Sequence, residues 1–175
     1  MLQSEIDKII KKISDVLFFN PDRILIVSTE FQKLYVVERG KIIRSYDVST
    51  SRYGIGNREG SNMTPRGIHR IEEKIGSGAP AGRIFESRND TGINWHSGLT
   101  GDNLILSRIL RLRGLEIGVN SGPGIDSYER YIYIHGTNQE HRIGTPNSHG
   151  CICMRNQDII ELFDSVEEGT IVFID

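Results

Sequence analysis

A cysteine set among small residues, with a histidine upstream, is the feature of this sequence most able to do chemistry. Cys151 ends the run Ser148-His149-Gly150-Cys151, and His135 begins the run His135-Gly136-Thr137. A cysteine becomes an acyl-transfer nucleophile when a base takes its proton and backbone amides hold the resulting oxyanion. We therefore expect Cys151 to be a nucleophile and His135 its base. Gly150 would leave the neighbouring amides open to a substrate.

The second cysteine, Cys153, lies two positions after Cys151. In a strand the two side chains would point to the same face, nearly parallel and poorly placed for a disulfide. We expect no structural bridge between them and a reactive role for one of them.

The elements that must position these residues read mainly as strands. Tyr131–His135 alternates, with Ile132 and Ile134 on a core face and His135 at the end of the strand. Asn156 can cap a helix over Gln157–Val166. Further strands are predicted at Arg23–Ser28, Lys33–Glu38, Lys41–Val48, Leu104–Leu115 and Thr170–Ile174, with loops at Ser49–Met63 and, as a long surface excursion, at Glu72–Gly101.

Length and composition indicate one mainly β domain. The chain has 175 residues, enough for a core, and its nineteen glycines against five prolines suggest many turns. A formal net charge of −2 gives no electrostatic reason to bind nucleic acid, and no apolar run is long enough to span a membrane. The first residues have the spacing of an amphipathic helix from Ile6 to Leu17. We expect residues 1–20 to form a helix packed on a single domain over residues 21–175.

The motifs together resemble the L,D-transpeptidase family (YkuD, or ErfK/YbiS). The C-terminal signature consists of His135-Gly136-Thr137, Ile143–Pro146, Ser148–Ile152 and Asn156. Weaker upstream matches are Leu34-Tyr35-Val36, Gly40-Lys41, Val48-Ser49-Thr50, Thr64-Pro65-Arg66-Gly67 and Glu168–Val172. The resemblance covers roughly residues 23 to 175, except 72–129. It implies a β-sandwich with an N-terminal amphipathic helix and a short helix after the cysteine.

The resemblance also implies a bacterial enzyme that acts on peptidoglycan stem peptides or muropeptides, with no cofactor or metal. Cys151 would attack the L-centre of the third stem residue, usually diaminopimelate, and release the terminal D-alanine. His135 would be the base, and the Gly136 carbonyl would orient it. The oxyanion hole would comprise the amides of Gly150, Cys151 and His149. Substrate contacts would come from Tyr133, Thr137, Ser148, His149 and Arg155.

One position departs from the family pattern. The family commonly has arginine two residues after the cysteine, where this chain has Cys153. Arg155, two residues further along, is the expected replacement for that cation. The departure bears on recognition of a substrate carboxylate more than on the nucleophile.

Several alternatives stay open at this point. The acyl group could pass to an amine, as in cross-linking, or to water, as in a cytoplasmic L,D-carboxypeptidase of murein recycling. The N-terminus shows no secretory signal, so we expect a cytoplasmic protein if Met1 is the native start and an envelope protein if the sequence is trimmed. The other interpretations are a zinc protein that uses His149, Cys151 and Cys153 with His135 or His141, and a non-catalytic peptidoglycan-binding module. The oligomeric state is not predicted.

Overall fold

The central strands have two buried faces, and their alternation divides the apolar residues between two cores. Along the first strand, Leu25 and Val27 belong to one core, whereas Ile24 and Ile26 belong to the other. The same alternation recurs in the second and the last strands of the chain. A sheet with this pattern must be covered on both sides.

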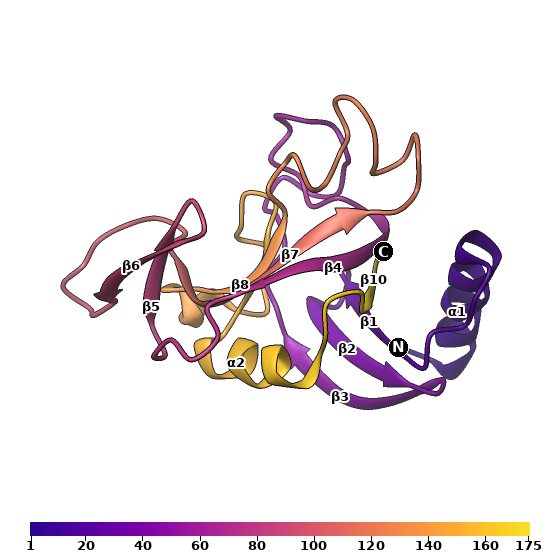
Figure 1. Cartoon of the computed structure of the whole chain (residues 1–175), viewed down its shortest axis with the longest axis horizontal. Helices are drawn as coiled ribbons and strands as arrows, with labels where there is room; N and C mark the ends of the chain where they lie inside the picture. The colour runs from indigo at the N-terminus through magenta and orange to yellow at the C-terminus, as the bar shows by residue number, and fades with distance from the viewer.

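The structure is a computed structural model that describes all 175 residues, and it contains ten strands and two α-helices (Figure 1). The helices are α1 (Gln3–Leu17) and α2 (Asn156–Ser165), and a short 3-10 turn spans Glu140–Arg142. The strands are β1 (Arg23–Ser28), β2 (Lys33–Glu38), β3 (Lys41–Asp47), β4 (Gly67–Ile75), β5 (Arg83–Glu86), β6 (Asn89–Asn94), β7 (Ile105–Gly114), β8 (Tyr133–Gly136), β9 (Ile152–Met154) and β10 (Ile171–Ile174).

The sheet bends until a side branch of it meets the segment that follows β3. Its main path runs β3-β2-β1-β10-β4-β7-β5-β6, and β8 and β9 branch from β7. β8 pairs antiparallel with β7 and parallel with β9. From β9 the pairing continues to Ser49, just after β3, because Ser49 and Cys153 form an isolated antiparallel bridge. The layers enclose a core of 19 buried residues, which gives the expected β-sandwich.

The two helices cover different parts of this sandwich (Figure 1). Ile6 and Ile13 of α1 are buried in a nine-residue core on the outer face of β1, β2 and β10. Ile159, Leu162 and Phe163 of α2 belong to the larger core inside the sandwich. Neither helix has the length and apolar character needed to cross a membrane.

Three local predictions need correction. The stretch 72–101, expected as a loop, contains the end of β4 and the β5–β6 hairpin, whose polar sequence has no apolar alternation. Cys151 lies before β9, so the two cysteines do not share one strand. Asn156 is the first residue of α2, and Arg155 is its N-cap. The Asn156 side chain instead donates to the Thr137 carbonyl oxygen and accepts a hydrogen bond from Ser107.

Tyr131 to His135 also departs from a simple two-faced strand. β8 begins at Tyr133, and Tyr131, with a φ of 55°, lies in the turn before it. Tyr133 and His135, predicted opposite the core face, are both buried because strands and loops cover that side as well.

His69 on β4 is a buried histidine that the fold keeps neutral. Its ring is completely buried, with Nδ1 3.1 Å from the Gly67 carbonyl oxygen and Nε2 2.9 Å from Ser127 Oγ. Burial lowers the pKa of His69 to about 4. The neutral ring therefore donates from Nδ1 and accepts at Nε2.

We expect the protein to lose stability between about pH 6.5 and pH 4. The folded-state pKa values of His69 and His135 are both about 4. Because the unfolded histidines titrate near pH 6.5, the unfolded chain binds protons first, which costs up to about 3 kcal/mol per histidine. Urea denaturation at pH 7 and pH 5 measures the loss.

The control for this prediction is a pair of histidine variants. His69→Gln should reduce the difference in unfolding free energy between the two pH values, whereas the exposed His141→Gln should leave it unchanged. An undiminished difference in His69→Gln would contradict the assignment.

Candidate active site

Backbone hydrogen bonds from the segment after β3 hold the nucleophile segment at both ends. Ser49 and Cys153 exchange two N–H···O bonds of 2.9 Å each. The carbonyl oxygen of Thr50 accepts from the amides of Asn147 at 2.9 Å and Ser148 at 3.0 Å. The chain around Cys151 is therefore an extension of the sheet rather than a free loop.

Thr64 supports the centre of the same segment. It is completely buried, accepts a hydrogen bond from the Ser51 amide at 2.9 Å and donates to the Gly150 carbonyl oxygen at 3.0 Å. Gly150 has a φ of 127°, where a side chain is strained, and a Cβ there would lie 3.4 Å from Ile132. Thr64, the first residue of the Thr64-Pro65-Arg66-Gly67 motif, thus holds the nucleophile segment in place through its hydrogen bonds.

Cys151 borders an open hollow, which we call the thiol hollow. It has a volume of about 520 Å³ and is lined by Ser87, Arg88, Ile105, Tyr131, Tyr133 and Cys151. The thiol is partly exposed and lies 3.5 Å from the Tyr131 carbonyl oxygen. Desolvation raises the pKa of Cys151 to about 11, although a backbone hydrogen bond from Tyr133 and the charge of Arg130 oppose the rise. At neutral pH the resting group is a thiol.

His135 is buried on β8, beside Cys153 of the neighbouring strand β9. Its Nδ1 donates to the Gly136 carbonyl oxygen at 2.8 Å, so Nε2 is the unprotonated ring nitrogen, and its hydrogen-bond partner is the Cys153 thiol. Burial lowers the pKa of His135 to about 4, so the ring is neutral at pH 7. Nε2 lies 3.8 Å from Cys153 Sγ, and no hydrogen bond joins His135 to Cys151. The site holds a neutral thiol and a neutral imidazole instead of an ion pair.

The backbone amides around Cys151 differ in availability. The amides of Cys151 and His149 have no acceptor within the protein. The Gly150 amide donates to Ser148 Oγ at 3.2 Å, and that hydroxyl donates to the Cys151 carbonyl oxygen at 2.5 Å. Of the three predicted oxyanion donors, Gly150 is therefore already used, and the other two remain available. Ser148, predicted to contact substrate, is buried and shapes this turn.

The His149 side chain lines a second hollow, and its ring also contacts Arg52 and Asn103. Its Nε2 lies 2.6 Å from an Arg52 nitrogen, and its Nδ1 lies 2.6 Å from the side-chain nitrogen of Asn103. Because arginine only donates, Nε2 is the acceptor and Nδ1 carries the proton. The proton on Nδ1 needs an acceptor, and the Asn103 side-chain amide supplies one when its oxygen and nitrogen exchange places.

This second hollow, the histidine hollow, has a volume of about 300 Å³. It is lined by Glu59, Gly60, Asn62, Glu129, Arg130, Tyr131, Ile132 and His149. Tyr131 therefore borders both hollows.

Of the other predicted substrate contacts, Tyr133 lines a hollow, whereas Thr137 and Arg155 do not. Tyr133 lines the thiol hollow, and its hydroxyl accepts from Arg88 at 3.2 Å. Thr137 is buried, and its amide donates to the Met154 carbonyl oxygen. Arg155 does not line either hollow and instead pairs with Asp47 and Asp158 at 3.4 and 3.7 Å.

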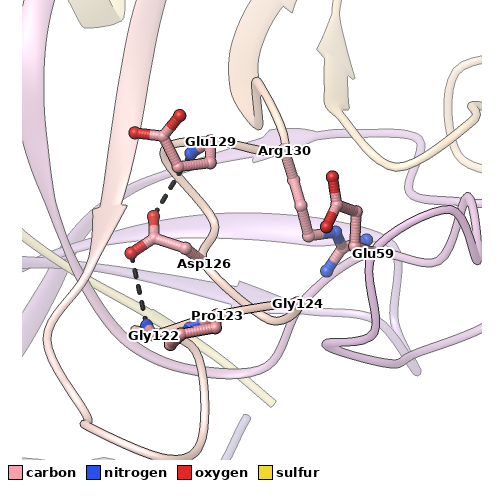
Figure 2. Close-up of a pocket in the computed structure, with 7 residues that line it drawn as sticks. All are labelled: Glu59, Gly122, Pro123, Gly124, Asp126, Glu129 and Arg130. Atoms are coloured by element: carbon pink, nitrogen blue, oxygen red, sulfur yellow. Dashed lines mark hydrogen bonds between the residues drawn. The ribbon is translucent and has the colours of Figure 1, made fainter.

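A third hollow lies between the loops that follow β3 and β7, with a volume of about 430 Å³ (Figure 2). Both Asp126 oxygens there accept from backbone amides, those of Glu129 at 3.2 Å and Gly122 at 3.3 Å. None of the predicted site residues lines it.

No group of three or more His, Cys, Asp or Glu side chains in the protein is positioned to share a metal ion.

Sequence reasoning missed several residues of the site. Arg88 and Arg130 approach Cys151 from segments that carry no recognisable motif. Thr64 lies in a motif that the sequence showed, but its contact with Gly150 depends on the fold. The approach of Cys153 to His135 follows from the parallel register of β8 and β9, which pairs these two residues.

The sequence comparisons point to one family. The profile of the YkuD family, the L,D-transpeptidase catalytic domain, matches residues 21–174. Over 47 residues the chain is 53% identical to the probable L,D-transpeptidase YbiS of Escherichia coli K12, which covers 26% of this chain and 15% of that protein. Over 45 residues it is 46% identical to the putative L,D-transpeptidase YqjB of Bacillus subtilis 168, with 26% of each chain covered. The matched stretches are thus a minor part of these curated relatives.

The structural comparisons give the same fold. An L,D-transpeptidase from Mycobacterium smegmatis superposes with a TM-score of 0.53 at 15% identity, covering 88% of this chain and 58% of that one. The L,D-transpeptidase (residues 123–326) from Xylanimonas cellulosilytica gives a TM-score of 0.52 at 19% identity, with 94% and 68% covered. At these identities the likeness concerns the fold.

We expect alkylation of Cys151 to report a high thiol pKa. Iodoacetamide reacts with the thiolate, and a pKa of about 11 leaves far less thiolate at pH 7 than in a free cysteine near 8.5. After allowing for the greater nucleophilicity of a more basic thiolate, alkylation at pH 7 should be roughly tenfold to a hundredfold slower than for a cysteine peptide. The measurement is the labelling rate against pH by mass spectrometry, and an apparent pKa below 8 would contradict it.

Thr64→Val should destabilise the nucleophile segment. The change keeps the shape of the side chain but leaves the Ser51 amide and the Gly150 carbonyl without their buried partner. The free energy of unfolding should fall by about 1–3 kcal/mol. Urea denaturation measures this loss, and the exposed Thr145→Val is the matched control. Equal stability of the two variants would show that Thr64 does not support the segment.

Proposed function

The chain belongs to the YkuD family of L,D-transpeptidase catalytic domains, and from this premise we propose that it is a cysteine acyltransferase of peptidoglycan tetrapeptide stems. The observation that carries the proposal is the partly exposed Cys151 thiol in the thiol hollow, next to backbone amides that have no acceptor. Such amides can donate hydrogen bonds to a carbonyl oxygen as negative charge develops on it.

In the first step Cys151 Sγ attacks the carbonyl carbon of the third stem residue. The thiol proton passes to the protein, the C–N bond to D-alanine breaks, and the departing amine takes the proton. We assign the base to His135, because its Nδ1–H is committed to Gly136 and its neutral Nε2 can accept. The product of this step is a thioester on Cys151 and free D-alanine.

General-base catalysis suits the resting protonation of this pair. With the pKa of Cys151 raised and that of His135 lowered, proton transfer in the resting state is uphill. The proton therefore moves as the Sγ–C bond forms, when the thiol becomes more acidic. Nε2 remains neutral and able to accept at any pH well above 4.

In the second step we propose that an amine takes the acyl group from Cys151. The support is the histidine hollow, which shares Tyr131 with the thiol hollow and is lined by the exposed carboxylates of Glu59 and Glu129 and by one cation, Arg130. An ammonium group is attracted to such a surface before it loses its proton and attacks. Transfer to water instead would make the protein an L,D-carboxypeptidase.

The test is incubation of the pure protein with a disaccharide-tetrapeptide, followed by mass spectrometry of protein and products. The wild type should carry the acyl group on Cys151 and release D-alanine. Cys151→Ala should lower D-alanine release by at least about a thousandfold, since Cys151 carries the only thiol that lines the thiol hollow.

Cys153→Ala is the matched control for the nucleophile, because it removes the buried thiol beside His135. We expect it to retain D-alanine release within about fivefold, a margin that allows for repacking of a small buried side chain. Equal loss in both variants would contradict the assignment of Cys151 alone. A cross-linked dimer among the products indicates amine transfer, and tripeptide alone indicates hydrolysis.

A further inference from the structure

Arg88 stands at the tip of a hairpin that projects toward the nucleophile. It follows Ser87 in the two-residue turn between β5 and β6, and both residues have positive φ values, 46° and 72°. Two-residue turns with positive φ values fit the right-handed twist of paired strands. The turn therefore fixes the position of the Arg88 backbone relative to β5 and β6. Arg88 and Cys151 line the same hollow of about 520 Å³.

Two tyrosines hold the guanidinium of Arg88 in place. One of its terminal nitrogens donates to Tyr133 Oη at 3.2 Å, and its carbon lies 5.1 Å from the centre of the Tyr131 ring. Contact with an aromatic face and one hydrogen bond orient the group without neutralising it.

The charge of Arg88 has no partner within the protein. It forms no salt bridge, and its only hydrogen bond is the one to Tyr133, which leaves most of its N–H donors free. Arg130, the other arginine near Cys151, differs in this respect because it donates to the carbonyl oxygens of Gly56 and Met63. Arg155, the predicted replacement for the family's arginine, is paired with Asp47 and Asp158.

We propose that Arg88 binds the terminal carboxylate of the stem peptide, a role that rests on the proposed function. In a tetrapeptide the D-alanine carboxylate lies only a few bonds beyond the carbonyl that Cys151 attacks. A guanidinium with free donors in the same hollow can bind that carboxylate in bidentate fashion. Arg88 thereby selects substrates that end in a free acid and supplies the cation that Cys153 does not.

The experiment compares two substrates that differ only in this charge. One is the tetrapeptide stem with a free D-alanine carboxylate, and the other ends in D-alaninamide. Wild-type protein should acylate Cys151 with a kcat/KM at least about tenfold higher for the acid than for the amide. Arg88→Gln should lose this preference, with kcat/KM for the acid reduced about tenfold and that for the amide changed less than about threefold.

Two further variants identify the cation. Arg83→Gln removes a positive charge and an ion pair with Asp90 from the same hairpin, but it does not line the thiol hollow, so the preference should persist. Arg155→Gln tests the competing position and should also retain the preference. Labelling of Cys151 with iodoacetamide, at a rate equal to that of the wild type, verifies that each variant keeps the folded site.

The outcomes separate this inference from the function on which it rests. Acylation of Cys151 in the wild type together with an unchanged acid preference in Arg88→Gln would overturn the role of Arg88 alone. Loss of the preference in Arg155→Gln, and not in Arg88→Gln, would overturn it in favour of the other arginine. No acylation of Cys151 by either substrate would overturn the proposed function and this inference with it.

Discussion

The two backbone hydrogen bonds between Ser49 and Cys153 are the constraint on which the site depends. They join the segment after β3 to β9 and so close the bent sheet around its larger core. The same junction places the nucleophile segment between Thr50 and Thr64, whose hydrogen bonds reach Ser148 and Gly150. The position of the thiol is consequently secured by the closure of the sheet, and apolar burial stabilises both together.

Burial also determines the protonation of the site. The β8–β9 pairing puts His135 where almost no solvent reaches it, and this favours the neutral ring. A neutral His135 ring does not lower the pKa of Cys151 as an imidazolium would, so the resting state holds no thiolate–imidazolium pair. A neutral pair has a practical advantage, because a thiol reacts more slowly with oxidants than a thiolate does.

Local pattern predicted the regular parts of the fold. β1 and β2 have the predicted bounds because their dense β-branched and apolar sequences match strands that are buried on both faces. The β5–β6 hairpin was not predicted, since Asn89–Asn94 is exposed and its sequence does not alternate. A short polar hairpin of this kind depends on its neighbour β7 more than on its own propensities.

The candidate site, like the fold, was predicted from the sequence only in part. Motif and resemblance drew attention to Cys151, His135 and the carbonyl of Gly136; the structure joins His135 to the Gly136 carbonyl and sets Cys153, two residues after Cys151, beside His135. They could not indicate Arg88, because its position comes from a turn far away in the sequence. Nor could they show that the Gly150 amide is occupied by Ser148, since that contact is a detail of one tight turn.

Tyr131 has a consequence for how such an enzyme could change its selectivity. Its ring borders the thiol hollow and the histidine hollow, and its backbone has a φ of 55° that few side chains adopt without strain. A substitution at this position alters both hollows together, so under the proposed function it would couple the choice of acyl donor to the choice of acceptor. Arg88 and Glu129 each border only one of these two hollows. Evolution or engineering can therefore alter either hollow separately at those positions, whereas a change at Tyr131, which lines both, alters the two together.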